Sequence, residues 1–165
     1  MRELDKVLEK NEKVLWEGAP NFLPFVFSGS QIGLSGIVFF AAAIPLILIA
    51  RKTLWFLILF FLIMGLLMII WFPLYKIFLF RKTYFMITEK RILIQTGIIG
   101  RDFGVVDFNK ITSAAVLVGF FDVLFGNTSG SIAIATAGPS RPYLISNISE
   151  PYEVFKILKK YSKSA

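Results

Sequence analysis

The chain has 165 residues, a formal net charge of +7, and neither cysteine nor histidine. Hydrophobic residues make up 56% of it, above the roughly 45–50% of soluble globular proteins. The lack of cysteine excludes a disulfide framework and a thiolate metal site, and the lack of histidine removes the commonest general base and metal ligand. We expect a membrane-associated protein without catalytic, metal or cofactor sites.

Residues 1–30 form the first predicted region, an N-terminal arm with a net charge of −1. Residues 1–13 favour a short polar helix, residues 14–20 break it, and its apolar face consists of Leu4, Val7 and Leu8. The apolar stretch 22–27 is too short to cross a bilayer, so we expect it at the membrane interface or as an extension of the next helix. No cleavable signal peptide is predicted, because the first long apolar stretch begins too late.

Two long apolar stretches follow. Ile32–Ala50 has 19 residues and Leu54–Tyr75 has 22, and neither contains a charge. At ~1.5 Å per residue, each is long enough for the roughly 30 Å hydrocarbon core of a bilayer. The chain is too short to bury two such helices in its own core, so we predict a transmembrane hairpin over residues 31–80, with spans at about 31–50 and 54–75. Residues 77–80 fit either a last helical turn or the approach to a strand.

Glycines mark one face of the first span. Gly29 and Gly33 have the GxxxG spacing, and Gly36 lies about one turn further on. Small residues let helix backbones approach closely in lipid, so these three are candidate helix-packing residues. The alternative is that glycine is simply common in membrane helices.

Positive charges near the ends of the spans predict their orientation. The connection between the spans carries Arg51 and Lys52, whereas the opposite side carries Lys13, Lys76, Arg81, Lys82, Lys90 and Arg91. We therefore expect an integral cell-membrane protein with both termini in the cytoplasm.

Residues 81–165 have the pattern of a small antiparallel β domain. Short β-rich stretches are separated by turn residues, at 83–88, 91–96, 102–108, 111–119, 131–137 and 143–148. Residues 120–127 fit an apolar loop or a helical turn. Pro151 begins a final amphipathic helix, whose apolar face consists of Val154, Phe155, Leu158 and Tyr161.

Several of these stretches carry a resemblance: Glu12–Gly18, Tyr84–Thr88, Lys90–Ile94, Thr96–Arg101, Asn109–Ile111, Val118–Gly126, Gly130–Thr136 and Pro151–Val154. In this order they resemble the bacterial and archaeal membrane-anchored pleckstrin-homology-like (PH-like) family. The resemblance implies a two-helix transmembrane hairpin followed by a partly open antiparallel β-barrel or sandwich, capped by a C-terminal helix. It also implies binding of lipids, peptides or further copies, without enzymatic activity. Residues 127–130 depart from the family's tight glycine turn.

Strand alternation assigns the loops to two ends of this domain. If the first strand leaves the membrane at Arg81, the loops 97–101, 119–127 and 148–151 face the membrane. Apolar tips with nearby cations suit the headgroup region, so the candidate membrane-surface residues are Lys82, Ile98, Ile99, Arg101, Phe120 and Phe121. The alternative is that the apolar side chains fold inward as a plug or contact the spans.

The same alternation places a candidate basic rim at the far end, formed by Lys90, Arg91, Lys110 and Arg141. An acidic partner protein is one hypothesis for this rim, and a solvated charged surface is the other. The excess of basic over acidic side chains in residues 81–165, eleven to six, favours attraction to anionic lipid headgroups. Nucleic-acid binding is not expected, because there is no long basic run or recognition motif.

No sequence motif for catalysis is present, neither a Walker A motif nor a nucleophile elbow. Asp102, Asp107 and Asp122 have no metal-ligand spacing and are expected to be scattered surface acids. We predict a PH-like binding or assembly module at the cytoplasmic membrane surface, partnered by the bilayer and by further copies or another protein. Two alternatives stay open: an accessory subunit of a membrane transporter or envelope enzyme complex, and a module that binds anionic-lipid headgroups.

Overall fold

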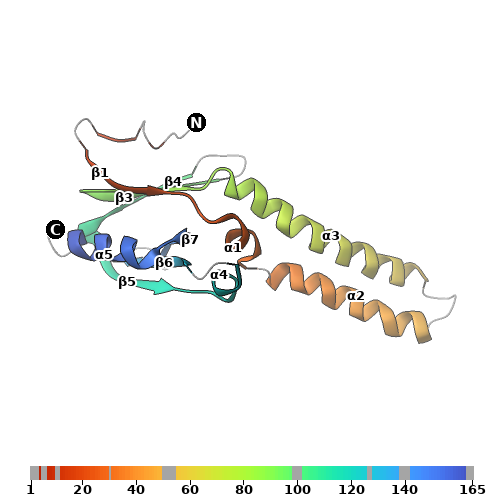
Figure 1. Cartoon of the computed structure of the whole chain (residues 1–165). Helices are drawn as coiled ribbons and strands as arrows, with labels where there is room; N and C mark the ends of the chain where they lie inside the picture. Colours follow the sequence, from red (N-terminus) through yellow and green to blue (C-terminus); the bar gives the residue numbers. More distant parts are fainter. Residues whose placement is uncertain are drawn as a thin grey trace. The chain divides into compact units, whose positions relative to one another are not determined.

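The computed structural model describes residues 4, 7–9, 12–29, 31–49, 55–97, 102–125, 128–137 and 142–162. The chain divides into two compact units. Unit 1 is made of Met1–Phe25 and Leu79–Ala165, and unit 2 is Val26–Phe78. Figure 1 shows the helices and strands of both.

Unit 1 contains two antiparallel sheets. Sheet A has the order β1-β2-β3-β4, with β1 (Val14–Gly18), β2 (Tyr84–Thr88), β3 (Arg91–Thr96) and β4 (Asp102–Asp107). Sheet B has the order β5-β6-β7, with β5 (Ile111–Leu117), β6 (Ser129–Thr136) and β7 (Tyr143–Ser149). The short 3-10 helix η2 (Phe108–Lys110) connects the sheets. The six strands predicted between residues 83 and 148 are confirmed, with ends that differ by a few residues.

β1 is a strand that the sequence pattern does not predict. Its residues, expected to break a helix, pair with β2 at the edge of sheet A, where Gly18 lies opposite Phe85. Between Val7 and Lys13 the residues that the structure describes are not helical, so the predicted polar helix is wrong there. Pairing with a strand far along the chain extends this region instead, and no local pattern announces such a partner.

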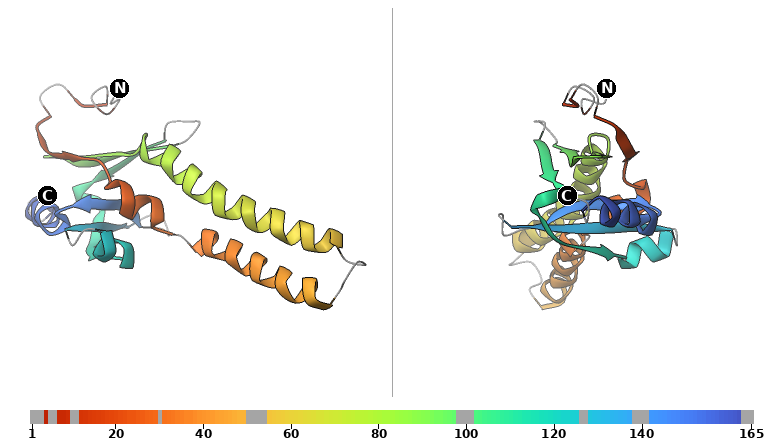
Figure 2. Two further views of the ribbon diagram at one scale, coloured as in Figure 1. Left: turned by 45° about the vertical axis from the view of Figure 1, so that its right-hand side comes forward. Right: turned by 90° about the vertical axis from the view of Figure 1, so that its left-hand side faces the viewer.

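The core of unit 1 lies between the two sheets. Alternate strand residues point inward from both sides, as the period of two in a strand requires, and they include Phe85, Ile87, Ile92, Ile94, Val106, Ile132, Ile134, Ile145 and Ile148. The helix α5 (Pro151–Ser162) adds Val154 and Leu158 to this core. The predicted amphipathic helix is therefore confirmed, and Figure 2 shows it lying along sheet B.

Two further helices are short, and the second of them runs across the division of the chain at Phe25. Helix α4 (Phe120–Phe125) forms in the segment for which the sequence allows a loop or a helical turn. Helix α1 (Phe22–Phe27) forms in the apolar stretch that is too short to cross a bilayer.

Unit 2 consists of apolar helices, α2 (Gln31–Ile49) and all but the end of α3 (Trp55–Phe80). Residues 77–80 are helical, which settles the alternative left open for them. In the part of the chain that the structure describes, α3 is the one helix long and apolar enough to cross a membrane by length and composition. Its most apolar 18-residue stretch is only 11% buried, and the apolar helix Gly33–Leu48 within α2 is shorter.

Candidate functional site

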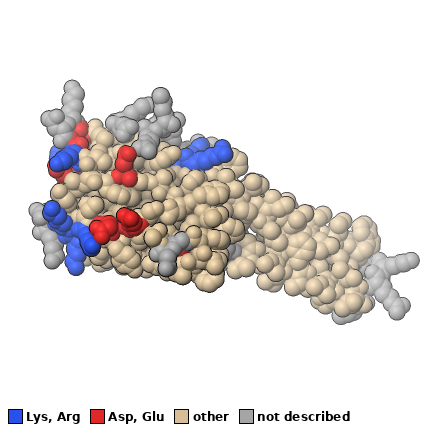
Figure 3. Space-filling model, viewed as in Figure 1, with Lys and Arg blue, Asp and Glu red and all other residues tan. Residues whose placement is uncertain are grey.

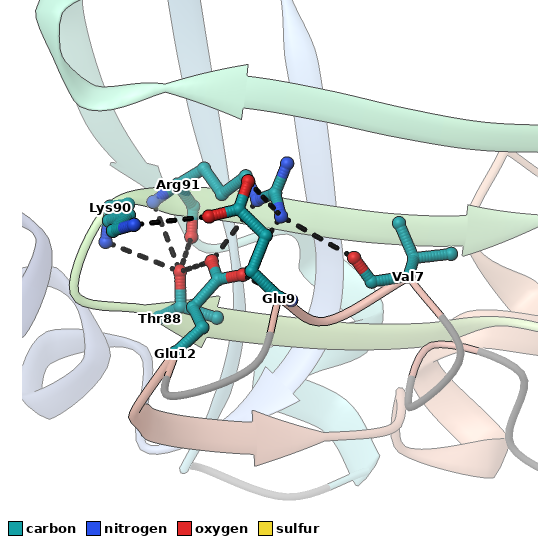
Figure 4. Close-up of polar contacts among 6 residues, drawn as sticks. All are labelled: Val7, Glu9, Glu12, Thr88, Lys90 and Arg91. Carbon is teal, nitrogen blue, oxygen red and sulfur yellow. Dashed lines mark hydrogen bonds and ion pairs between the residues drawn. The ribbon is translucent and has the colours of Figure 1, made fainter.

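A cluster of charged side chains lies at the turn between β2 and β3 (Figure 4). The Arg91 guanidinium holds the Glu12 carboxylate through two nitrogens: Nη2 donates to Oε2 at 2.8 Å and Nε donates to Oε1 at 3.1 Å. The Thr88 hydroxyl donates to Glu12 Oε1 at 2.7 Å and accepts the backbone N–H of Arg91 at 3.1 Å. Glu12 is thus held by the last residue of β2 and the first residue of β3.

Most of this contact is shielded from solvent. The Glu12 side chain is 0% exposed and the Arg91 side chain 18%. The hydrogen bond from Arg91 lowers the pKa of the Glu12 carboxyl group, whereas burial by itself raises this pKa. The hydrogen bond has the larger effect, and the pKa falls from 4.5 to about 2. The same hydrogen bond raises the pKa of Arg91. Both groups are therefore charged at neutral pH, and the pair is a bidentate, charge-assisted contact.

Glu9 extends the cluster toward solvent. Its carboxylate oxygens lie 3.3 Å from Arg91 Nη2 and 3.1 Å from Lys90 Nζ. Because Glu9 and Lys90 are exposed, we expect their ion pair to contribute little to stability. Arg91 Nη2 also donates to the Val7 carbonyl at 3.4 Å. The cluster as a whole fastens the residues ahead of β1 to the β2–β3 turn.

The same residues ahead of β1 also pack on sheet A through an apolar contact. We call the described residues of this segment, 4, 7–9 and 12, the strap. Leu4 is buried against Met86 and Leu93, which lie opposite each other in β2 and β3. Partly buried side chains surround this contact: Val7, Leu8 and Tyr84. The apolar side chains predicted to share one helix face therefore do share one surface, but as part of a strap and not of a helix.

The members of the predicted basic rim that the structure describes have carboxylate partners within the chain. Lys90 and Arg91 bind the strap, as described above. Lys110 Nζ lies 2.8 Å from Asp107 Oδ2, and this hydrogen bond raises the pKa of Lys110. Arg141 lies outside the described residues. Binding of an acidic partner to the rim stays a prediction, and such a partner has to compete with these carboxylates.

A buried carboxylate lies at the other end of unit 1, in α4. Asp122 is 3% exposed, so its prediction as a surface acid is wrong. Its Oδ1 accepts the Ser129 hydroxyl and the Asn147 side-chain amide, both at 2.9 Å, and its Oδ2 accepts the Gly119 backbone N–H at 2.9 Å. Three donors thus satisfy the buried carboxylate, and the two of them that lie in β6 and β7, Ser129 and Asn147, hold α4 on sheet B.

Asn147 connects this network to the start of α1. Its backbone has φ 49, a left-handed conformation that asparagine tolerates better than most residues, at an irregularity in the pairing of β6 with β7. The Asn147 backbone N–H donates to the Ser131 hydroxyl at 2.9 Å, and its carbonyl accepts the Asn21 N–H at 2.7 Å. Asn21, the residue before α1, is therefore hydrogen-bonded to Asn147, which also binds Asp122 of α4.

The last residues of α3 lie at this same end of unit 1. The Phe80 ring packs against Phe22 and Phe25 of α1, with ring centroids 5.1 and 6.1 Å apart. Asn21, directly before α1, belongs to the network just described. The chain passes between the units after Phe25 and before Leu79. Both passages therefore lie at the end of unit 1 that carries α4.

Helix α4 turns an apolar face outward. Phe120, Val123 and Leu124 are 74%, 57% and 59% exposed. Of the predicted membrane-surface residues, Lys82 is also exposed, whereas Phe121 is half-buried with its ring stacked 6.0 Å from that of Phe125. The remaining three lie outside the described part of the chain: Ile98, Ile99 and Arg101.

Within unit 2, α2 and α3 approach each other at two glycines. A Cβ on Gly36 would lie 2.8 Å from the Gly65 carbonyl oxygen, and a Cβ on Gly65 would lie 2.9 Å from the Gly36 carbonyl oxygen. A Cβ on Gly33 would make an ordinary contact of 3.6 Å with Phe72. Gly29 lies before α2 and has φ 76, so it serves the turn there. Gly65 is absent from the glycines that the sequence pattern singles out.

The charged residues are distributed unevenly over the visible surface. Figure 3 shows the Lys, Arg, Asp and Glu side chains of this face gathered over unit 1. Among the described residues, no group of three or more acidic side chains is placed to hold a metal ion.

Comparisons with known proteins point to one family. The family model described as the bacterial PH domain matches residues 32–162. One similar solved structure is a DUF1696 family protein with a pleckstrin-homology domain from Shewanella loihica, 16% identical, with 48% of this chain and 70% of that chain covered and a TM-score of 0.39. Another is a pleckstrin homology domain from Shewanella amazonensis, 13% identical, with 48% and 66% covered and a TM-score of 0.39. No curated protein sequence matches the chain significantly.

Proposed function

Because the chain belongs to the bacterial PH domain family, we propose that it is a non-catalytic binding and assembly module anchored in the cell membrane. PH domains commonly mediate protein or lipid interactions, and the family is generally non-catalytic. Membrane anchoring is proposed on one observation above all. Helix α3 has 26 apolar-rich residues, and only 11% of its most apolar stretch is buried. In lipid, the apolar side chains of such a helix need no cover from other parts of the protein.

In this proposal α2 and α3 form a membrane hairpin over residues 31–80. Helix α2 has 19 residues, about 28 Å at the usual rise, and its outward side chains are apolar, with Leu34, Val38 and Leu48 among the most exposed. Contiguous apolar surface of this extent marks a membrane or protein interface. The excess of Lys and Arg on the side of the termini favours a cytoplasmic location for both of them.

We also propose that the α4 end of unit 1 contacts the lipid headgroups. Support comes from the chain path, since both passages between the units lie at this end of unit 1. The exposed face of α4 then enters the interface, and Lys82 meets lipid phosphates. The other residues proposed for this contact are Ile98, Ile99, Arg101 and Phe121.

Fluorescence quenching in nanodiscs tests the headgroup contact. The chain has no cysteine, so Phe120→Cys gives a single site for an environment-sensitive dye on α4. Leu144→Cys is the matched control, because Leu144 is also exposed and lies near the start of β7, away from the end that contacts Asn21. Headgroup-attached nitroxide should quench the dye at position 120 and spare the dye at 144. Equal quenching at both positions, or none at 120, contradicts the contact.

Recognition of anionic lipids is a finer form of the same proposal. Nanodiscs with an increasing fraction of anionic lipid should increase the quenching at position 120 if the net positive charge of residues 81–165 contributes. The full chain is required, because β1 and the strap precede unit 2 in the sequence and complete unit 1.

An accessory subunit of a membrane complex is the second candidate. The observation that favours it is an open apolar groove on α3, lined by Leu67, Met68, Trp71, Phe72 and Tyr75, which suits a further apolar helix. Copurification in mild detergent separates the two candidates. A defined homo-oligomer supports self-assembly, whereas a stoichiometric foreign polypeptide supports the accessory subunit.

A further inference from the structure

Strand β4 is an open edge of sheet A. Its place at the end of the order β1-β2-β3-β4 leaves one side of its backbone without a neighbouring strand. Within the described part of the chain, no turn, loop or cap hydrogen bond involves the backbone of residues 102–107. Alternate N–H and C=O groups of β4 therefore point away from β3 and are available to a further strand.

Regular pairing distinguishes β4 from the other edge strands of the two sheets. All of its residues pair with β3 in one unbroken register, from Thr96 opposite Asp102 to Arg91 opposite Asp107. The pairings of β1 with β2, of β5 with β6 and of β7 with β6 each contain an irregularity. Because such irregularities discourage further strands from pairing at an edge, β4 is the edge best formed to accept one.

The outer face of β4 presents apolar side chains to solvent. Phe103 and Val105 point to the same side of the strand and are 39% and 41% exposed. A strand added beside β4 covers part of both side chains. It therefore gives apolar burial that the chain alone does not obtain.

Two oxygen acceptors near the start of β4 lack donors. The Asp102 carboxylate is exposed and forms none of the ion pairs found among the described residues. Gln95 lies opposite Phe103 and is 6% exposed, and its amide oxygen Oε1 has no hydrogen-bond partner in the described part of the chain. A buried acceptor without a donor is destabilising. The two acceptors therefore favour a segment that carries cationic donors, as lysine and arginine do.

A second copy of the chain fits this edge poorly. In the antiparallel pairing of two β4 strands over their full length, Asp102 of each copy lies opposite Asp107 of the other copy. Each of these positions then holds two carboxylates against the one ammonium group of Lys110, which already pairs with Asp107. Like charges directly opposite each other destabilise a strand pair, so the charges favour a different molecule.

We propose that β4 binds an extended, basic segment of another protein as an added antiparallel strand of sheet A. In this segment an apolar side chain lies beside Val105. Two positions later an arginine lies beside Phe103, where its guanidinium packs on the ring and supplies a donor to Gln95 Oε1. A lysine at the next position meets the Asp102 carboxylate. The proposal rests on the function of unit 1 as a binding module, and it is independent of membrane anchoring.

Fluorescence anisotropy with a labelled peptide tests the site on the full chain in an uncharged detergent. The probe is the end-blocked hexapeptide Ser-Thr-Val-Thr-Arg-Lys, whose lysine lies opposite Asp102 and whose serine lies opposite Asp107 in the antiparallel register. Saturable binding with a Kd of about 100 µM is expected for so short a strand. A control peptide with glutamate in place of the arginine and the lysine should bind at least about tenfold more weakly.

Methylation of the peptide backbone separates strand addition from simple charge attraction. In an added strand the amides of alternate residues point toward β4. Two probes are therefore N-methylated at opposite sets of alternate residues, and one should lose at least about tenfold in affinity while the other changes little. In the protein, Asp102→Asn and Gln95→Met should each weaken the unmethylated probe. Leu144→Thr is the matched control, because Leu144 is exposed on the edge strand β7, and it should leave binding unchanged.

Several results overturn the proposal. They are equal effects of the two methylation patterns, no saturation below about 1 mM, and binding that either Asp102→Asn or Gln95→Met leaves unchanged. The chain has no cysteine, so Val105→Cys with a short bismaleimide tests a second copy as the occupant. A crosslinked dimer in greater yield than with Leu144→Cys assigns the edge to a second copy and also overturns the proposal. Failure of these tests leaves membrane anchoring untouched, because the quenching in nanodiscs tests the membrane contact separately.

Discussion

Arg91 and Glu12 are 79 residues apart in the sequence and are joined by hydrogen bonds of 2.8 and 3.1 Å. Unit 2 lies between them in the chain, so the pair connects the two separate segments of which unit 1 is made. With Leu4 on Met86 and Leu93, it makes the residues ahead of the first apolar helix a structural part of the β domain.

Removal of the Glu12 charge should destabilise unit 1. Glu12→Gln keeps the size of the side chain but loses the charge-assisted contact with Arg91, and we expect a loss of about 1–3 kcal/mol in the free energy of unfolding. Glu9→Gln is the control, because the exposed Glu9 pairs should be worth about 0–1 kcal/mol. Denaturant unfolding in detergent measures both, and equal losses for the two variants contradict the assignment.

The Glu12 pair also predicts a pH dependence. The folded-state pKa of about 2 is depressed below the usual 4.5, so the stability from Glu12 is fully present above the unfolded-state pKa and is lost as the pH falls through the folded-state pKa. The difference in unfolding free energy between the native chain and Glu12→Gln should be constant from neutral pH down to about pH 5 and then shrink toward pH 2. A difference that shrinks already between pH 8 and pH 6 is the contrary result.

The strands and α5 are predictable because their signals are local. Alternating apolar residues bounded by turn residues predict β2 to β7, and the apolar face of residues 151–162 predicts α5. β1 and the strap are not predictable in this way. Their residues are held by partners in β2 and β3, and a single sequence gives no local sign of such distant contacts.

The buried carboxylate in α4 leads to a separate prediction. Asp122→Asn replaces one acceptor oxygen by an NH2 group. This new donor then faces another donor, from Gly119 or from Ser129 and Asn147. A loss of about 1–3 kcal/mol is expected, together with faster hydrogen exchange at the Gly119 amide. Asp102→Asn is the control, since Asp102 is exposed in β4 and its replacement should change stability by less than about 0.5 kcal/mol. Equal losses of stability for Asp122→Asn and Asp102→Asn contradict the anchoring role of Asp122.

At the α4 end of unit 1, the exposed Phe120 is predictable from the sequence, whereas the buried Asp122 is not. Phe120 begins a strongly apolar stretch between two predicted strands, and such a stretch suits an exposed contact residue. Asp122 two positions later gives no sign of burial, because aspartate is rarely buried unless it is paired. Two of its three donors, Ser129 and Asn147, lie in β6 and β7, and only the folded sheet brings them to Asp122.

Contact between the two helices of unit 2 depends on the absence of a side chain at Gly36. Gly36→Ala places a methyl group 2.8 Å from the Gly65 carbonyl oxygen, so the helices must separate, at a cost of about 1–3 kcal/mol. Gly33→Ala is the control, because its methyl group meets Phe72 at an ordinary 3.6 Å. Thermal unfolding in detergent, followed by circular dichroism, should show a lower midpoint for Gly36→Ala and little change for Gly33→Ala. Equal midpoints for the two variants are inconsistent with this contact.

Alkaline extraction of membranes that contain the native chain tests membrane anchoring most directly. Carbonate at high pH strips peripheral proteins and leaves proteins with spanning helices in the lipid pellet. A membrane-anchored chain should stay in the pellet and be released only by detergent, because α3 and α2 expose apolar side chains that water does not accommodate. A chain that appears in the carbonate supernatant, and stays monomeric in solution without detergent, contradicts membrane anchoring.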